Sequence, residues 1–307
     1  MATVLQSPRL KVERTNFRMT PVDTMQNSQQ TLASTQNTTT RVVLVTGASS
    51  GIGRSCCEYL AGKEMAVYGA SRSLSAGKVG AFNSLRMDVT DDASVNEAVQ
   101  QIYGSCGRID AVINNAGNGI AGAVEETSSQ EAMAQMDTNF FGVHRVCRAV
   151  LPIMRQQRGG VIINISSLAG LLAVPFQAFY SASKFAMEGL TEALRMEVKP
   201  FGIRVVLIEP GDFKTEFPTN RRNTAEAEKS SIYREQVDRC VGVMQEEEKN
   251  GHDPLEVARL AERIIHDPSP RLRYTTGPMG ERIGPKLKSI LPYRLYEYLF
   301  MKHYKLA

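Results

Sequence analysis

The chain has 307 residues, of which 42% are hydrophobic and 22% charged, and its formal net charge is +4. This length allows one large domain with a substantial core, and so mild a charge without a long Lys/Arg run does not indicate a nucleic-acid partner. The five cysteines show no C-x-x-C spacing and the four histidines are scattered, which predicts free thiols in a reducing compartment and no metal site. The sequence contains no uncharged apolar run long enough to predict a membrane-spanning helix.

Residues 1–40 are rich in Thr, Ser, Gln and Asn and contain the tracts NSQQ and TQNTTT. A segment of this composition buries little apolar surface, so we predict a disordered extension. The basic residues near the start are also typical of an organelle-targeting peptide, but Glu13 and Asp23 count against that interpretation. We therefore expect a cytoplasmic protein with one folded domain over residues 41–307.

From residue 41 onward, short apolar runs alternate with segments of helical spacing. Strands are predicted at 42–45, 65–70, 83–88, 109–114, 161–166 and 204–208, and helices at 52–60, 93–103, 130–156 and 178–200. Continuous apolar strands suit a parallel sheet that is buried on both faces. The alternation predicts an α/β fold with a Rossmann-type, doubly wound parallel sheet and helices on both faces, which binds ligands beyond the carboxyl ends of its strands.

The segment after the first strand reads TGASSGIG, from Thr46 to Gly53. Its glycines allow a tight turn and a close approach of the backbone to a pyrophosphate, and the helix that follows offers free N–H groups. The residues predicted to bind a dinucleotide here are Gly47, Ser49, Ser50, Gly51, Ile52 and Gly53.

The segment after the second strand, Ala70-Ser71-Arg72-Ser73, contains no carboxylate. A carboxylate at this place normally holds the ribose 2′-hydroxyl of NAD(H). A guanidinium fits a 2′-phosphate instead, through charge-assisted hydrogen bonds. We therefore expect NADP(H) as the cofactor, unless Arg72 is simply a solvated loop residue.

Polar or small residues follow the later strands as well. Asp88 can accept a hydrogen bond from an adenine amino group, and small residues let the backbone lie against a cofactor, although turn chemistry explains both equally well. The residues are Asp88 and Val89 after the third strand, Asn115, Ala116 and Gly117 after the fourth, Ser166 and Ser167 after the fifth, and Pro210, Gly211 and then Thr215 after the sixth.

The stretch FYSASK places Tyr180 and Lys184 four residues apart, and therefore on one face of the predicted helix. An ammonium beside a phenol favours the phenolate and would lower the pKa of the tyrosine. Taken alone, the pair can equally be a packed tyrosine beside a solvated lysine.

The motifs TGASSGIG, DV, NNAG, the Asn139 of TNFFG, ISS, YSASK and PG follow one another in this order between residues 41 and 220. In this the sequence resembles the short-chain dehydrogenase/reductase family. The stretches YSASKFAMEGL and KPFGI, with DPLEVA and PSPRLRY near the end, are similar to the branch of 17β-hydroxysteroid dehydrogenase type 1 and the retinol dehydrogenases.

The resemblance implies a catalytic tetrad of Asn139, Ser167, Tyr180 and Lys184 and hydride transfer between NADP(H) and a carbonyl or alcohol. Tyr180 would be the general acid, or the base in the reverse direction, while Ser167 hydrogen-bonds the substrate oxygen. Lys184 would lower the pKa of Tyr180 and bind the nicotinamide ribose, and Asn139 would hold a water beside it. Thr215 would contact the carboxamide, unless it is an ordinary cap or loop residue. A homo-oligomer, dimer or tetramer, is also expected.

The charged, helix-prone segment 212–251 is predicted to be a substrate lid. Apolar side chains that can line a pocket beneath it are Leu171, Val174, Pro175, Phe176, Phe213 and Phe217, although core packing or surface exposure explains each of them as well. An apolar pocket favours a lipophilic, steroid-like or retinoid-like substrate. The end of the chain, 285–307, mixes bases, tyrosines and aliphatic residues; it predicts either an amphipathic helix on a membrane surface or packing beside the substrate site or a partner subunit.

Other functions stay open at this point. Within the enzyme interpretation, a 3-oxoacyl reductase or another carbonyl reductase is the alternative, although the length of chain beyond residue 250 argues against the former. A cofactor-sensing binding protein on the same fold, or a peripheral membrane protein anchored by the tail, are alternatives from other classes.

Overall fold

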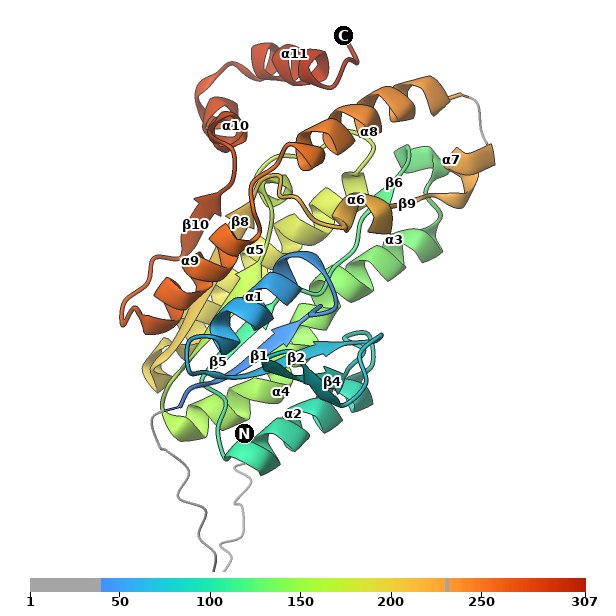
Figure 1. The fold of residues 1–307 in the computed structure, drawn as a ribbon. Coiled ribbons are helices and arrows are strands. Elements are labelled where there is room, and N and C mark those ends of the chain that lie inside the picture. Colours follow the sequence, from blue (N-terminus) through green and yellow to red (C-terminus); the bar gives the residue numbers. More distant parts are fainter. Residues whose placement is uncertain (1–39, 230–231) are drawn as a thin grey trace, which may run out of the picture. The chain divides into compact units, whose positions relative to one another are not determined.

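Eight strands form one sheet in the order β10-β8-β7-β5-β1-β2-β4-β3 (Figure 1). The computed structural model describes residues 40–229 and 232–307, which belong to the compact unit Thr39–Ala307. β3 pairs antiparallel with β4, and the other neighbours in this sheet pair in parallel. The strands are β1 (Val42–Thr46), β2 (Ala66–Ser71), β3 (Gly77–Val79), β4 (Phe82–Arg86), β5 (Ala111–Asn114), β7 (Gly160–Ile165), β8 (Ile203–Pro210) and β10 (Arg273–Thr276).

Helices cover both faces of this sheet (Figure 1). Because side chains alternate along a strand, Val42 and Leu44 of β1 face one core while Val43 and Val45 face the other. The first core includes α2 (Asp92–Cys106), α4 (Gly142–Gln157) and α5 (Ala178–Val198), and the second includes α1 (Gly51–Ala61) and α9 (Leu255–His266). The predicted doubly wound α/β sheet is confirmed.

The strand order reverses between β1 and β5, which is where such a sheet opens a ligand-binding crevice. The remaining elements lie near this end. They are β6 (Ile120–Ala121) paired with β9 (Arg222–Asn223), α6 (Phe217–Asn220), α7 (Ala225–Lys229), α8 (Arg234–Lys249), α10 (Met279–Ile290), α11 (Tyr293–His303), and the short turns η1 (Val124–Glu126) and η3 (Leu168–Gly170). The turn η4 (Lys199–Phe201) instead lies at the other end of the sheet, where α5 leads into β8.

The predicted strands all form, and two strands of the large sheet were not predicted. β3 and β10 are edge strands of three and four residues without a continuous apolar run, so periodicity does not reveal them. The long helical stretch predicted over 130–156 forms, but it includes a π-helical turn that was not predicted, η2 (Asp137–Phe141), between α3 (Ser129–Met136) and α4. π-helical turns insert extra backbone into a helix and occur often at functional sites.

The predicted disordered extension lies outside the described residues. Among the residues that the structure describes, no helix is long and apolar enough to span a membrane.

Candidate active site

A cavity of about 1010 Å³ lies beyond the carboxyl ends of β1, β2, β4, β5, β7 and β8. Every residue predicted to bind the cofactor lines it except Gly53, and every residue of the predicted tetrad lines it except Asn139. Segment 212–251, predicted to be a lid, and the helices α10 and α11 contribute a large part of the remaining wall. The fold therefore gathers into one cavity residues that are spread over most of the chain.

The glycine loop between β1 and α1 is held by close backbone contacts. Gly47 has φ +68°, and a Cβ on it would lie 2.8 Å from the Cα of Ala116, so only glycine fits there. The Asn115 amide donates to the carbonyl oxygens of Thr46 and Gly47 at 3.1 and 3.2 Å. A Cβ on Gly53 would collide with the Gly47 carbonyl oxygen, so Gly53 allows α1 to pack against the loop instead of lining the cavity.

The N-terminus of α1 already binds a carboxylate of the protein itself. The Gly51 N–H donates to Oε2 of Glu216 at 2.9 Å, and Glu216 directly precedes α6. Free N–H groups and the helix dipole make this the place where a pyrophosphate is expected to bind. Glu216 therefore marks an anion site, although sequence reasoning did not identify it.

The two residues predicted to contact the adenosine part of a cofactor lie close together. Arg72 is exposed and lines the cavity after β2. Burial alone would raise the pKa of Asp88, but hydrogen bonds from the Thr90 N–H and hydroxyl, with the charges of Arg72 and Arg145, lower it overall. Asp88 thus stays ionised, and Arg72, which forms no hydrogen bond or ion pair with the described residues, can receive an anionic group.

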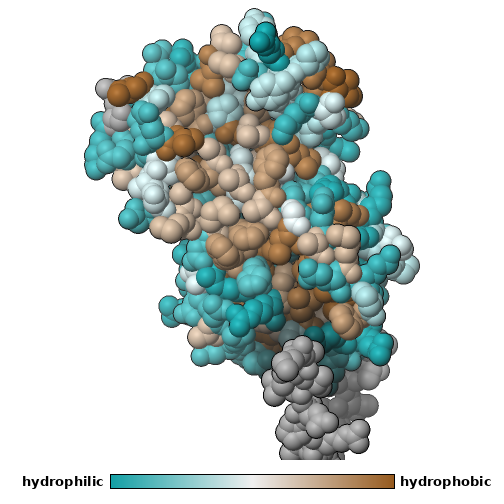
Figure 2. Space-filling model, turned by 180° about the vertical axis from the view of Figure 1, so that it is seen from behind, coloured by the Kyte–Doolittle hydropathy of each residue, from teal (hydrophilic) through white to brown (hydrophobic). Residues whose placement is uncertain are grey.

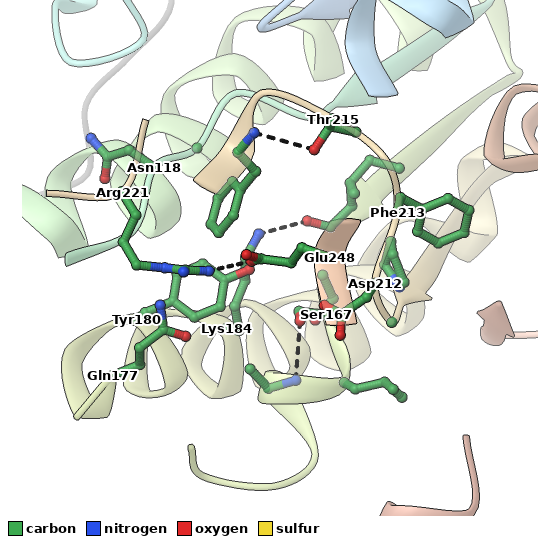
Figure 3. A pocket seen from close by; sticks show the side chains of 18 of the residues that line it. Asn118, Ser167, Gln177, Tyr180, Lys184, Asp212, Phe213, Thr215, Arg221 and Glu248 are labelled. Carbon is green, nitrogen blue, oxygen red and sulfur yellow. Dashed lines mark hydrogen bonds and ion pairs between the residues drawn. The ribbon is translucent and has the colours of Figure 1, made fainter. Parts of the chain in front are cut away.

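Tyr180 and Lys184 lie one turn apart on α5 and are both buried. The Lys184 ammonium donates to the Ile165 carbonyl at 2.8 Å and lies 5.7 Å from the centre of the Tyr180 ring. The Ser167 hydroxyl, which follows β7, lies near enough to the Tyr180 hydroxyl to lower the pKa of that phenol. Phenol, serine hydroxyl and ammonium therefore converge in the cavity beyond β7, as Figure 3 shows.

The pKa of Tyr180 shifts in the opposite direction to the expected one. Burial raises it to about 12, against the lowering effects of the Ser167 hydroxyl and the charge of Arg221. Burial likewise lowers the pKa of Lys184 to about 8. The reason is that both side chains leave water on the same buried helix face, and the loss of solvation exceeds the effect of the neighbouring groups.

Asn139 lies behind the cavity wall, in the π-helical turn η2, and is fully buried. Its Oδ1 accepts from the Asn118 N–H at 3.0 Å, and its Nδ2 donates to the Asn118 carbonyl at 3.0 Å and to Ser183 Oγ at 3.1 Å. Ser183 in turn donates to the Tyr180 carbonyl at 2.7 Å. The amide thus connects the loop after β5 to the helix that carries Tyr180 and Lys184.

The residues after β8 have structural partners of their own. The Gly211 N–H donates to the Thr276 carbonyl at 2.8 Å, and Thr215 Oγ1 accepts from the Phe217 N–H at 3.2 Å. Thr215 also packs against Gly51. It lines the cavity, but these contacts also fit the alternative that it serves as a cap for the segment entering α6.

Part of the predicted apolar pocket is confirmed. Val174, Phe213 and Phe217 line the cavity, whereas Leu171, Pro175 and Phe176 are not among its lining residues. Phe176 instead packs against Tyr233. Sequence reasoning missed most of the apolar wall, which comes from segments far apart in the chain: Leu172, Met244, Leu287, Leu291, Leu299 and Phe300.

Sequence reasoning also missed a buried ion pair beside Tyr180. Arg221 donates to Glu248, and the two side chains are 3% and 8% exposed. The ring of Phe217 lies 5.7 Å from the Tyr180 ring and 5.7 Å from the Arg221 guanidinium, so these side chains form one cluster over the phenol (Figure 3). Both charged residues belong to the predicted lid, where charge runs give no indication of burial.

Comparison with known proteins agrees with this arrangement. The short chain dehydrogenase family model matches residues 41–226. A 3-ketodihydrosphingosine reductase from Bacteroides thetaiotaomicron is 43% identical over 258 residues, which cover 84% of this chain and 96% of that protein. Retinol dehydrogenase 8 from Bos taurus is 35% identical over 258 residues, covering 77% of this chain and 81% of that protein.

The fold is similar to solved structures as well. The crystal structure of a short-chain dehydrogenase from Streptomyces avermitilis matches with a TM-score of 0.72 at 30% identity, covering 86% of this chain and 97% of that one. The resemblance found in the sequence is confirmed by the family model and by these relatives. The chain therefore belongs to the short-chain dehydrogenase/reductase family, oxidoreductases that use a nicotinamide cofactor to interconvert alcohols and carbonyl compounds.

Proposed function

We propose that this protein is an NADP(H)-dependent oxidoreductase that interconverts a lipophilic ketone or aldehyde and its alcohol. The observation that carries the proposal is the convergence of Ser167, Tyr180 and Lys184 in one cavity with a dinucleotide-type glycine loop at one end and apolar side chains at the other. The nicotinamide, when bound, supplies or accepts the hydride. The residues of the chain supply positioning and proton handling.

In the direction of reduction, Tyr180 donates its hydroxyl proton to the substrate oxygen. A phenol whose pKa is raised to about 12 is protonated at neutral pH, as this role requires. The Ser167 hydroxyl donates a hydrogen bond to the same oxygen and stabilises the charge that develops on it. The positive charge of Lys184, buried beside the phenol, stabilises the phenolate that forms when the proton leaves, and Asn139 holds the helix in place through Ser183.

Arg72 supports NADP(H) over NAD(H) as the cofactor. It lines the adenosine end of the cavity next to two serines, Ser71 and Ser73, and no carboxylate stands among these three residues. A guanidinium and two hydroxyls suit a 2′-phosphate, whereas the carboxylate that normally accepts from the ribose hydroxyls of NAD(H) is missing from this segment. Steady-state kinetics with NADPH and NADH test this preference directly.

The apolar wall formed by α10 and α11 supports a long-chain substrate, and so do two relatives that are a 3-ketodihydrosphingosine reductase and a retinol dehydrogenase. We therefore infer that long-chain ketones are the first substrates to test. The assay follows NADPH oxidation with 3-ketodihydrosphingosine, retinal, a steroid ketone and a short-chain ketone. Activity confined to the short-chain ketone would contradict the lipophilic assignment.

We propose that the enzyme is cytoplasmic and contacts a membrane where its substrate enters, and the exposed surface of α10 and α11 supports the membrane contact. Ile290, Tyr293 and Tyr298 are exposed there among Lys and Arg side chains, and brown side chains stand at the end of the molecule where Figure 1 places α11 (Figure 2). Basic and apolar side chains together bind anionic bilayers. Flotation with anionic liposomes, compared for the full chain and a 285–307 truncation, tests this contact.

We also propose that the protein forms a homo-oligomer. The face opposite to that of Figure 1 carries apolar patches among hydrophilic side chains (Figure 2). Met133, Phe141 and Phe185, from α3, η2 and α5, are exposed large apolar side chains. Light scattering after size-exclusion chromatography gives the mass, and a monomer at micromolar concentration would contradict a stable oligomer.

A further inference from the structure

Four carboxylates line the cavity on the side of Tyr180 that faces α8 and α10. They are Asp212, Glu247, Glu248 and Glu281. The cationic side chains that line this part are Arg221, Arg222 and His303, besides Lys184 beneath the phenol. His303 is paired with Glu247 at 3.2 Å, and Arg221 with Glu248. Among the described residues, these pairs leave Asp212 and Glu281 as the two carboxyl groups of the cluster without an ion-pair partner.

Glu248 retains an unused oxygen in a buried position. Its Oε1 accepts from Arg221, whereas its Oε2 has no hydrogen-bond partner among the described residues. The same holds for Nε and Nη1 of Arg221. Buried charged groups ordinarily use their full hydrogen-bonding capacity, because an unmade bond leaves the loss of solvation uncompensated. This pair therefore offers one acceptor and two donors to a further group.

Asp212 lies next to this pair and is half-buried at the end of the segment Pro210–Gly211. Within the part of the chain that the structure describes, its carboxylate makes neither a hydrogen bond nor an ion pair, while its backbone N–H donates to Glu281 at 2.7 Å. Burial, and then the charges of Glu281, Glu248 and Glu247, raise its pKa to about 8. A cation bound here would offset the cost of burying the ionised Asp212 carboxylate and its repulsion by the neighbouring carboxylates.

The cluster is close enough to the reacting centre to contact the same substrate. The charges of Arg221, Glu248 and Asp212 all shift the pKa of Tyr180, and Figure 3 shows their side chains around the phenol. The Phe217 ring lies between the Arg221 guanidinium and the Tyr180 ring and contacts both of them. A group bound by the cluster therefore lies beside the carbonyl that receives the proton from Tyr180.

We propose that Asp212 and Glu248 bind an ammonium group next to the reacting carbonyl, so that the substrate is a long-chain amino ketone. This rests on the proposed function and adds the residues that select the substrate. The ammonium donates to the Asp212 carboxylate and to Oε2 of Glu248, while Arg221 donates to an oxygen on the same headgroup. The apolar chain extends along Leu287, Leu291 and Leu299 of α10–α11. A carboxylate or phosphate headgroup would instead lie against Asp212 and Oε2 of Glu248, which can only repel it when ionised.

The test compares two substrates that differ only in the amine. These are a long-chain 2-amino-3-ketone, such as 3-ketodihydrosphingosine, and a ketone of equal chain length without the amine. The ratio of their kcat/KM values is measured for the wild type, Asp212→Asn and Glu248→Gln. Glu235→Gln is the matched control, because Glu235 is on the same helix as Glu248, is 81% exposed and does not line the cavity. Thermal unfolding of each variant verifies that it is folded, and Asp212→Asn is nearly isosteric.

We expect the ratio of kcat/KM for the amino ketone to that for the amine-free ketone to fall by about tenfold or more in Asp212→Asn and Glu248→Gln, because each variant loses one charge-assisted hydrogen bond. The ratio should stay unchanged in Glu235→Gln. An equal loss for both substrates, or no loss for either, would overturn the assignment. Calorimetric binding of sphinganine against a fatty alcohol of the same length measures amine recognition without turnover. Wild-type protein that prefers the amine but reduces neither ketone would refute the proposed function alone, whereas equal binding of amine and alcohol would refute the ammonium site alone.

Discussion

Replacing Glu216 by Gln should strengthen NADPH binding, because this carboxylate occupies the place expected for the cofactor pyrophosphate. Its Oε2 accepts from the Gly51 N–H at 2.9 Å, at the N-terminus of α1. A bound pyrophosphate needs the same N–H groups and carries charge of the same sign. The cofactor must therefore displace Glu216 and tolerate its charge nearby.

The magnitude follows from the exposed position of Glu216. A carboxylate at a solvent-exposed helix N-terminus stabilises its site by about 0.3–1 kcal/mol. Removing that competing contact should tighten NADPH binding by about two- to fivefold, since a difference of 1.4 kcal/mol corresponds to a factor of ten. The gain should shrink at high salt, because the interaction lies at the surface.

The assay is a fluorescence or calorimetric titration of NADPH into the wild type and Glu216→Gln at low and high salt. Glu226→Gln serves as the control, since Glu226 on α7 is 62% exposed and its ion-pair partner, Lys229, is exposed as well. Without cofactor, Glu216→Gln should unfold at the same or a slightly lower temperature than the wild type. Weaker NADPH binding in Glu216→Gln would refute the reasoning, because it would mean that the carboxylate holds the lid closed over the cofactor.

Four further predictions follow from the site. Tyr180→Phe should lower kcat by at least about 10²-fold while leaving the Kd for NADPH nearly unchanged, and full activity would remove Tyr180 from the mechanism. Arg72→Asp should weaken NADPH binding and raise relative NADH use, and an unchanged preference would contradict the assignment of the 2′-phosphate site. Gly53→Ala should lower the free energy of unfolding by about 1–3 kcal/mol, because its Cβ meets the Gly47 carbonyl; denaturant unfolding equal to the wild type would contradict this packing. The folded protein keeps the Asp212 proton up to about pH 8 and the unfolded chain releases it near 3.8, so this carboxyl makes stability fall as pH rises through that window; Asp212→Asn should flatten the fall, and an unchanged slope would contradict the shift.

Much of the fold is determined by local patterns that act within one element. The strands β1, β5, β7 and β8 are continuous apolar runs, and such runs are typical of strands buried on both faces of a parallel sheet. The helix phase of α5 likewise brings Tyr180 and Lys184 to one face. Residues that follow these strands reach the same edge because parallel strands share their carboxyl ends.

Elements that depend on distant partners could not be predicted in this way. β10 has no apolar run of its own and exists because β8 offers it an open edge. The π-helical turn around Asn139 departs from the helical periodicity of 130–156, and its hydrogen bonds to Asn118 and Ser183 form only when three segments meet. The shift of the Tyr180 pKa also depends on burial, which spacing alone does not determine.

Local patterns are sufficient to predict the sheet, the glycine loop and the spacing of Tyr180 and Lys184, because each depends on contacts within a few residues or on one strand's burial. Which charged residues of segment 212–251 enter the cavity depends instead on how distant segments pack. Arg221 and Glu248 are 27 residues apart and look like solvated surface in the sequence, yet they pair in a buried position over Tyr180. The physical reason is that burial of a charge depends on which elements pack around it, and that is a property of the folded chain as a whole.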